Sequence, residues 1–301
     1  MESQEFLYVN RETGAVEKEP VCCSFAIKFF LETRLGRGVY SFLCKNSLFS
    51  RIVGRFQRLR MTRRFIRPFV EKYRICEDEA LRPLCDFTSF NDFFIRKLKP
   101  EARPICGGSE ICVTPADGAY LVFPSIKDVS LFSVKNQLFS LNSLLEDQQL
   151  ASEYAEGSMA IARLAPFDYH RFHFPVEGIA GTPRLINGYL FSVHPLMLKR
   201  NLKVFAENKR EITVIESKEF GKVVYIEIGA LNVGSIHQTF APGSYVGKGA
   251  EKGFFAFGGS TVVLLFEPQR IIFDADLVHH SAQGLETRCR MGQSLGKRFS
   301  S

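Results

Sequence analysis

A serine stands behind two glycines at the start of an apolar run, in the order Gly258-Gly259-Ser260-Thr261. The glycines lack Cβ atoms, so they permit unusual backbone angles and a close approach to the Gly259 carbonyl. The Ser260 hydroxyl could attack that carbonyl and exchange the amide for an ester, because its nucleophile lies one carbon from Cα. Elimination and hydrolysis would then leave a pyruvoyl group and ammonia. The same residues are also typical of a Gly-Gly hairpin turn.

Two histidines lie three residues apart in one short segment, at His170 and His173. If this segment is extended or irregular, the two side chains can serve different sites, one as a base and the other as an acid. A histidine base suits the activation of a serine hydroxyl near neutral pH. The alternatives are a surface loop or a pair of metal ligands. No third ligand is evident from the spacing, so we predict no metal site.

An aspartate, Asp117, lies in the sequence Thr114-Pro115-Ala116-Asp117-Gly118, which has the composition of a tight turn. Asp117 could also orient a histidine as the third member of a Ser–His–Asp relay. Without chain cleavage, such a relay of Ser260, His173 and Asp117 would make the protein a serine hydrolase. Both interpretations stay open at this point.

The elements that must position these residues change in character along the chain. Residues 1–20 are polar and are expected to form a mobile N-terminal arm. Residues 21–73 show helical periodicity and residues 76–105 form a second unit, so we predict a helical region over residues 21–105. Within them, Ser89 precedes an apolar run and is predicted to begin a helix. After about residue 106, short β-rich runs alternate with turn residues. We therefore predict an α+β protein, with a helical N-terminal region followed by a β-rich, sandwich- or barrel-like catalytic domain (106–301).

The strand predictions in the second half rest on four apolar runs. A helix around residues 142–149 is expected to interrupt them. The predicted strands cover residues 119–123, 157–163, 223–228 and 261–266.

Positive charge is concentrated in residues 51–74, which we call the basic segment. It holds nine Lys and Arg against one Glu, whereas the whole chain has a net charge of +7. Such a segment indicates an anionic partner, either nucleic acid or an acidic lipid surface. A basic, Phe-rich amphipathic stretch is typical of a membrane interface, but also of a helix packed on its own domain. A non-catalytic binding module is therefore a second alternative function.

The cysteine pattern and the hydropathy of the chain indicate the redox compartment and the kind of membrane contact to expect. The eight cysteines include no Cys-x-x-Cys pair and are expected to be mostly buried thiols in a reducing compartment. We find no signal peptide and no apolar run of about 18 residues, so any membrane contact is expected to be peripheral.

Together, the order and the amino-acid sequences of these motifs resemble those of the phosphatidylserine decarboxylase proenzymes, over about residues 89–296. The start Asn10-Arg11-Glu12-Thr13-Gly14 and the Gly-Gly-Ser-Thr form resemble the bacterial branch of that family. The matching segments are residues 89–100 (SFNDFFIRKLKP), 114–118 (TPADG), 168–173 (DYHRFH), 233–236 (VGSI) and 258–261 (GGST).

The resemblance implies a reaction and a set of roles. The family cleaves its own chain, here between Gly259 and Ser260, and Ser260 becomes a covalent pyruvoyl group, so no external cofactor is expected. That group forms a Schiff base with phosphatidylserine and releases CO2 to give phosphatidylethanolamine. The resemblance gives His173 the role of general base with Asp117 as its partner, and gives His170 a role in decarboxylation. The large chain (1–259) and the small chain (260–301) are expected to stay together as a heterodimer.

The implied substrate also changes the interpretation of the N-terminal half. A two-chain lipid stays in the bilayer, so the enzyme must reach it at the surface. Each basic residue near an anionic surface adds on the order of 1 kcal/mol of attraction. We therefore expect residues 21–105 to associate with an anionic membrane, on the cytoplasmic face of the cell membrane, and we expect no nucleic acid partner.

Overall fold

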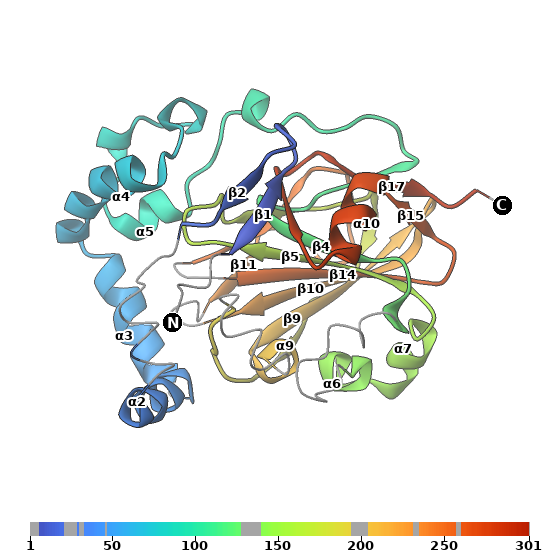
Figure 1. Cartoon of the computed structure of the whole chain (residues 1–301), viewed down its shortest axis with the longest axis horizontal. Coiled ribbons are helices and arrows are strands. Elements are labelled where there is room, and N and C mark those ends of the chain that lie inside the picture. Colours follow the sequence, from blue (N-terminus) through green and yellow to red (C-terminus); the bar gives the residue numbers. More distant parts are fainter. Residues whose placement is uncertain are drawn as a thin grey trace.

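The computed structural model describes residues 6–20, 29, 33–45, 47–127, 140–193, 204–230, 235–256 and 260–300. The helices of the N-terminal half gather at one end of a large sheet and further helices pack against the sheet, which agrees with the predicted α+β class (Figure 1). The division of the chain into an arm, a helical region and a catalytic domain stays a prediction.

The largest sheet within the described residues has 11 strands, and all neighbouring pairs except β1 and β16 are antiparallel. Its strands follow the order β12 (Tyr245–Val246), β7 (Gly178–Ala180), β9 (Arg210–Ser217), β10 (Gly221–Gly229), β14 (Ser260–Phe266), β5 (Ser158–Leu164), β4 (Gly118–Phe123), β16 (Glu286–Cys289), β1 (Leu7–Asn10) and β2 (Val16–Lys18), with β8 (Arg184–Ile186) beside β9.

The central strand β14 explains the position of the candidate serine. Its seven residues are all buried. Alternate side chains enter two hydrophobic cores, with Val262 and Leu264 on one face and Val263 and Leu265 on the other. A strand buried on both faces has a continuous apolar sequence, and this is why residues 261–266 could be predicted.

The other strands predicted for residues 106–301 are present, and the predicted helix is divided in two. The strands expected at residues 119–123, 157–163 and 223–228 are confirmed as β4, β5 and part of β10. The helix expected at 142–149 is two short helices, α6 (Leu141–Leu145) and α7 (Gln148–Glu153). The break comes from Glu146, which has a left-handed φ of 46°, and from Asp147, which caps α7.

Two smaller sheets and two further helices complete the β-rich part. Helix α10 packs its buried Leu277 into the core that contains Val262, and its Ser281 hydroxyl accepts a hydrogen bond from the Val122 amide at 2.9 Å. The smaller sheets are β11 (Ile236–Gln238), β13 (Glu251–Phe255) and β6 (Arg171–His173), and β15 (Ile271–Phe273), β17 (Ser294–Arg298) and β3 (Ile111–Val113); the helices are α9 (Val204–Glu207) and α10 (Ala275–Ala282).

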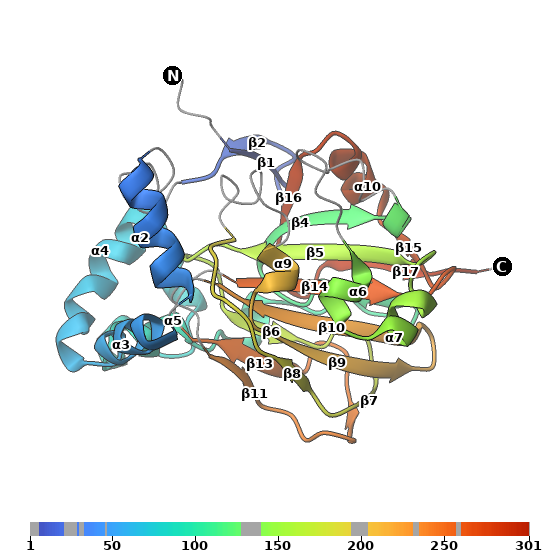
Figure 2. The same ribbon diagram turned by 90° about the horizontal axis from the view of Figure 1, so that it is seen from below.

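The helices of the N-terminal half lie together at one edge of the sheets (Figure 2). Helices α4 and α5 share a small core of Ile66, Val70 and four phenylalanines. Ser89 caps α5 by accepting a hydrogen bond from the Asp92 amide at 3.2 Å, which confirms the predicted helix start. The elements are α2 (Arg34–Lys45), α3 (Ser47–Gln57), η1 (Arg60–Phe65), α4 (Ile66–Tyr73), η2 (Glu77–Glu79), η3 (Leu84–Asp86), α5 (Phe90–Phe94) and η4 (Pro100–Ala102).

The polar start of the chain differs from the mobile arm expected. Strands β1 and β2 form a hairpin, and β1 runs parallel to β16 at the edge of the large sheet. Two ion-pair groups hold the segment: Arg11 pairs with Asp274 and Asp276, and Glu19 pairs with the buried Arg163. The partners Asp274, Asp276 and Arg163 are distant in sequence from residues 11 and 19, so the sequence alone does not indicate the docking.

Candidate active site

Ser260 is the first residue of β14 and its side chain is fully buried, with 0% exposed. It lies between Leu164 of β5 and Gly229 of β10 in the strand register. Because Gly229 has no side chain, β10 does not crowd the serine from that side. The Ser260 hydroxyl therefore lies at the start of a central strand, shielded from solvent.

His170 is the histidine next to Ser260. It precedes β6, is fully buried, and has its Nδ1 3.5 Å from the Ser260 Oγ. Its ring stacks on Phe94, with the ring centroids 4.0 Å apart. Burial and the positive charge of Arg96 lower the pKa of His170 to about 3, so the ring is neutral at pH 7. Its Nε2 has no hydrogen-bond partner within the described part of the chain.

His173 lies at the end of β6 and has other partners. Its Nδ1 is 2.9 Å from the Gly249 carbonyl oxygen, which only accepts, so Nδ1 carries the proton. Its Nε2 then faces the Tyr169 hydroxyl at 3.2 Å. Burial lowers the pKa of His173 as well, against the opposing effects of the Gly249 carbonyl and the Glu251 charge. His173 is therefore held as a neutral, oriented imidazole.

Asp117 is held by an arginine. Arg103 donates to both carboxylate oxygens, with Nη2 2.6 Å from Oδ2 and Nε 2.8 Å from Oδ1, and the Met291 amide donates at 2.8 Å. Burial alone would raise the pKa of Asp117, but Arg103 and the Met291 amide lower it below its usual value. The next residue, Gly118, must be glycine because a Cβ there would lie 2.7 Å from the Arg163 carbonyl oxygen.

The structure thus brings the four predicted residues into one region without joining them as a single relay. The His173 amide donates to the Pro115 carbonyl at 2.7 Å, so β6 runs beside the segment that carries Asp117. No hydrogen bond between described side chains joins Asp117 to His173, and Ser260 contacts His170 rather than His173. Gly259 lies outside the described residues. The roles of all four residues therefore stay predictions.

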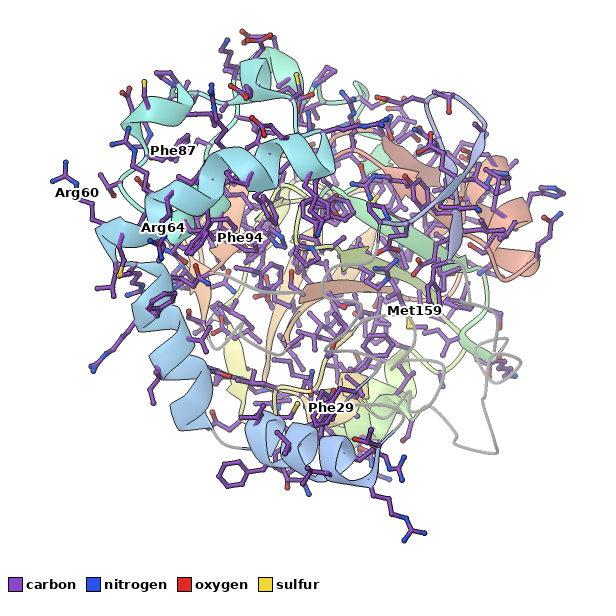
Figure 3. The ribbon with its side chains drawn as sticks, turned by 60° about the vertical axis from the view of Figure 1, so that its left-hand side comes forward. Phe29, Arg60, Arg64, Phe87, Phe94 and Met159 are labelled. Atoms are coloured by element: carbon purple, nitrogen blue, oxygen red, sulfur yellow. The ribbon has the colours of Figure 1, made fainter. Side chains whose placement is uncertain are left out.

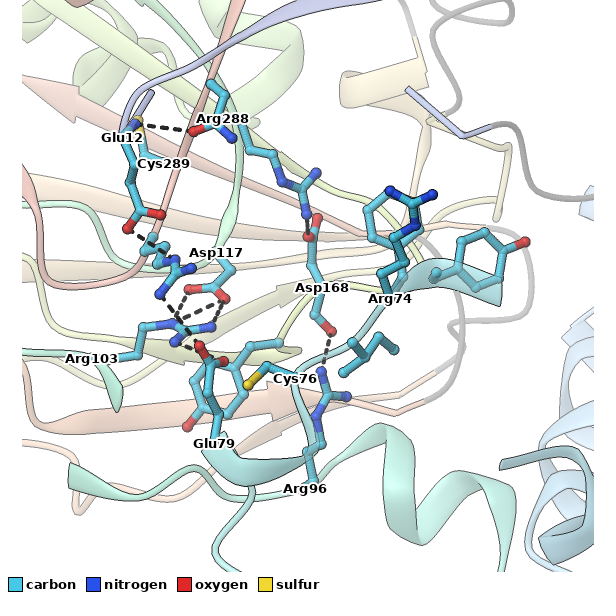
Figure 4. A pocket seen from close by; sticks show the side chains of 16 residues that line it. Glu12, Arg74, Cys76, Glu79, Arg96, Arg103, Asp117, Asp168, Arg288 and Cys289 are labelled. Carbon is cyan, nitrogen blue, oxygen red and sulfur yellow. Dashed lines mark hydrogen bonds and ion pairs between the residues drawn. The ribbon is translucent and has the colours of Figure 1, made fainter. Parts of the chain in front are cut away.

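A pocket of about 200 Å³ beside this region contains residues that the sequence did not single out (Figure 4). Asp117 and Tyr169 line it, together with Arg96, Arg103 and Arg288. Arg96 belongs to the segment of residues 89–100, so that motif was a signal for it. Arg103 and Arg288 could not be found from spacing, because their partners are distant in sequence.

The described residues offer neither a metal site nor a membrane-spanning helix. No group of three His, Cys, Asp or Glu side chains in the described ranges could hold a metal ion. None of the described helices is long and apolar enough to cross a bilayer. Of six described cysteines, Cys44, Cys112 and Cys289 are buried, while Cys76, Cys85 and Cys106 are exposed, so the thiols are less buried than expected. Cys22 and Cys23 lie outside the described ranges.

The fold and the site define an α+β protein with a serine–histidine centre at the end of a buried strand. Residues 90–297 match the family model described as phosphatidylserine decarboxylase. A protein of Chlamydia trachomatis serovar D, named phosphatidylserine decarboxylase proenzyme, is 76% identical over 301 residues, which is 100% of both chains. The same name belongs to relatives in Chlamydia pneumoniae (54% identity, 96% of both chains) and Fusobacterium nucleatum (40% identity, 98% of this chain and 99% of the relative).

The chain belongs to the phosphatidylserine decarboxylase family. This confirms the family predicted from the motifs, and with it the prediction that the protein is an enzyme of the carboxy-lyase class.

Proposed function

We propose that this protein cleaves its own chain between Gly259 and Ser260, converts Ser260 into a pyruvoyl group, and decarboxylates phosphatidylserine to phosphatidylethanolamine. The observation that carries the proposal is the fully buried Ser260, whose Oγ lies 3.5 Å from the His170 Nδ1 in a chain of this proenzyme family.

Cleavage needs only groups of the chain and one water. The Ser260 Oγ bonds to the Gly259 carbonyl carbon as the peptide C–N bond breaks; a base takes the hydroxyl proton and passes it to the Ser260 nitrogen, which leaves as an amine. Loss of the Ser260 Cα proton then breaks the Cβ–O bond and leaves Gly259 as a carboxylate. Water hydrolyses the remaining dehydroalanine and releases ammonia. We assign the base to His173, supported by the family resemblance and by its unprotonated Nε2.

The residues around position 260 fit a pyruvoyl group. That group supplies a ketone that takes up the substrate amine and accepts the electron pair released with CO2. His170 lies beside this position and has an orphaned buried Nε2, so it is suited to holding or delivering a proton there. Its pKa of about 3 keeps it neutral, which avoids an unpaired buried cation next to the reacting atoms.

The two product chains should remain associated. The small chain would carry β14, which pairs with β10 and β5 and is buried along its whole length. Each of its buried Val and Leu side chains contributes roughly 1.5–3 kcal/mol relative to exposure to water.

The exposed surface of the helices supports a peripheral contact with an anionic membrane. Four large apolar side chains of α2, α3 and η1 are more than half exposed: Leu35, Phe42, Ile52 and Met61. Arginines stand among them, and Arg60 projects away from the body of the protein in Figure 3, whereas Phe94 points inward. Exposed apolar side chains interspersed with basic residues suit the boundary of an acidic lipid surface. We place this contact on the cytoplasmic face of the cell membrane.

Turnover tests the proposal directly. Wild-type protein should release CO2 from vesicles that contain phosphatidylserine, whereas Ser260→Ala should release none because no ketone can form. Thr261→Val is the matched control, since the neighbouring Thr261 hydroxyl is buried and has no partner among described residues. A serine hydrolase would instead release fatty acid or headgroup without CO2, and that result would refute the proposal.

A further inference from the structure

Arg96 is a buried cation that forms no ion pair with the described residues. Its side chain lines the pocket of Figure 4, and the residue is only 6% exposed. Its Nη2 reaches the Asp168 backbone oxygen at 3.5 Å, and its guanidinium lies 4.8 Å from the centre of the Phe93 ring. No carboxylate of the described residues forms an ion pair with Arg96. Burial lowers the pKa of Arg96 to about 10, so the side chain is still charged at pH 7.

The carboxylates of the pocket are already used by other arginines. Asp117 pairs with Arg103, and Asp168 pairs with Arg288. The remaining pairs join Arg103 to Glu79 at 3.0 Å and Arg290 to Glu12 and Glu79 at 3.1 and 3.3 Å. Five arginines and four carboxylates line the pocket, which leaves one positive charge in excess. The fifth arginine, Arg74, is exposed at the end of α4, so the desolvated excess charge lies at Arg96.

Arg96 also lies close to the proposed reacting centre. Phe94, two residues earlier, stacks on the His170 ring that faces Ser260. After burial, the charge of Arg96 has the largest effect on the His170 pKa. The charge of Arg96 thus acts on the His170 ring that contacts Ser260.

We propose that Arg96 binds the phosphodiester group of the substrate headgroup. This proposal rests on the proposed function. In a serine phospholipid the phosphorus is joined to the amine-bearing carbon through one carbon and one oxygen, so phosphate and reacting amine must be bound near each other. The planar guanidinium can donate to two phosphate oxygens at once.

The substrate carboxylate is the less suitable partner for Arg96. It leaves as neutral CO2, so a cation held against it stabilises the ground state more than the transition state and slows the reaction. The phosphate keeps its charge throughout, so Arg96 can bind it in every step.

The test uses cleaved holoenzyme with a soluble short-chain phosphatidylserine and three competitors. Glycerophosphocholine offers a phosphodiester without a primary amine, 3-hydroxypropionate offers the carboxylate alone, and the third is inorganic phosphate. Arg96→Met should raise KM and the inhibition constant of glycerophosphocholine by about tenfold or more, the loss expected for a charged hydrogen bond. Inhibition by 3-hydroxypropionate should not change, and Arg96→Lys should restore part of the affinity. Arg298→Met, which removes a charge in the distant β17, is the control.

Several results would overturn the proposal. The first is a cleaved Arg96→Met variant with the same KM and the same inhibition by glycerophosphocholine as the wild type. The second is a variant that loses inhibition by 3-hydroxypropionate instead. The third is inorganic phosphate that inhibits the wild type as strongly as glycerophosphocholine does. If Arg96→Met does not fold or cleave, wild-type competition decides: inhibition by 3-hydroxypropionate but not by glycerophosphocholine contradicts it. If wild-type protein is uncleaved or releases no CO2, the proposed function fails. If the wild-type enzyme is active and any of the contradicting results above is found, only the role of Arg96 is rejected.

Discussion

At the scale of single residues, the two histidines have different surroundings. The His170 ring lies between Phe94 and Ser260, with one nitrogen unpartnered among the described residues. The His173 ring is held at both nitrogens, by the Gly249 carbonyl and the Tyr169 hydroxyl. This difference supports two separate tasks, cleavage for His173 and turnover for His170.

Substituting each histidine separately tests this division. His173→Gln should accumulate uncleaved chain, because loss of a general base slows a step by about 10²–10⁴-fold. His170→Gln should cleave normally but lose turnover by a similar factor. Gel analysis of the chains and CO2 release measure the two effects.

His279→Gln is the matched control, because that histidine is exposed on α10. If His170→Gln blocked cleavage and His173→Gln did not, the division would be wrong. The 3.5 Å contact between His170 and Ser260 would then identify His170 as the base.

At the scale of elements, the sequence predicted the strands and helices that depend only on residues close together in the chain. The strand β14 follows from an unbroken apolar run, and the start of α5 follows from a serine cap. The sequence did not predict the break between α6 and α7, because it depends on a left-handed residue, Glu146. It also missed the docking of β1 and β2, because their ion-pair partners are far away in the chain.

The helices provide a prediction about membrane binding. Reversing three charges with Arg58→Glu, Arg60→Glu and Arg64→Glu should weaken binding to anionic vesicles, because each cation near the surface contributes about 1 kcal/mol. Vesicle co-sedimentation at fixed ionic strength measures the loss. Lys218→Glu, Lys222→Glu and Lys297→Glu change three exposed lysines of β17 and of the β9–β10 hairpin, outside the N-terminal helices, and serve as the control. Equal binding by both triple variants would show that net charge, not the helical surface, controls attachment.

At the scale of the whole molecule, the family could be predicted because its motifs are short and specific, whereas the roles of the site residues stay predictions. The sequence could not show which partners these side chains have. Asp117 was expected to orient a histidine, yet its carboxylate is bound by Arg103. Likewise, the lack of an ion pair at Arg96 among the described residues follows only from the pairs that the neighbouring carboxylates form with other arginines.

The intact mass of the purified wild-type protein tests the central claim most directly. We predict two chains, residues 1–259 and 260–301, with the smaller one lighter by one ammonia than a chain that begins with serine. Ser260→Ala should remain a single chain of 301 residues. A wild-type protein that retains turnover as one uncleaved chain, or a small chain that begins with an unmodified serine, would contradict the account.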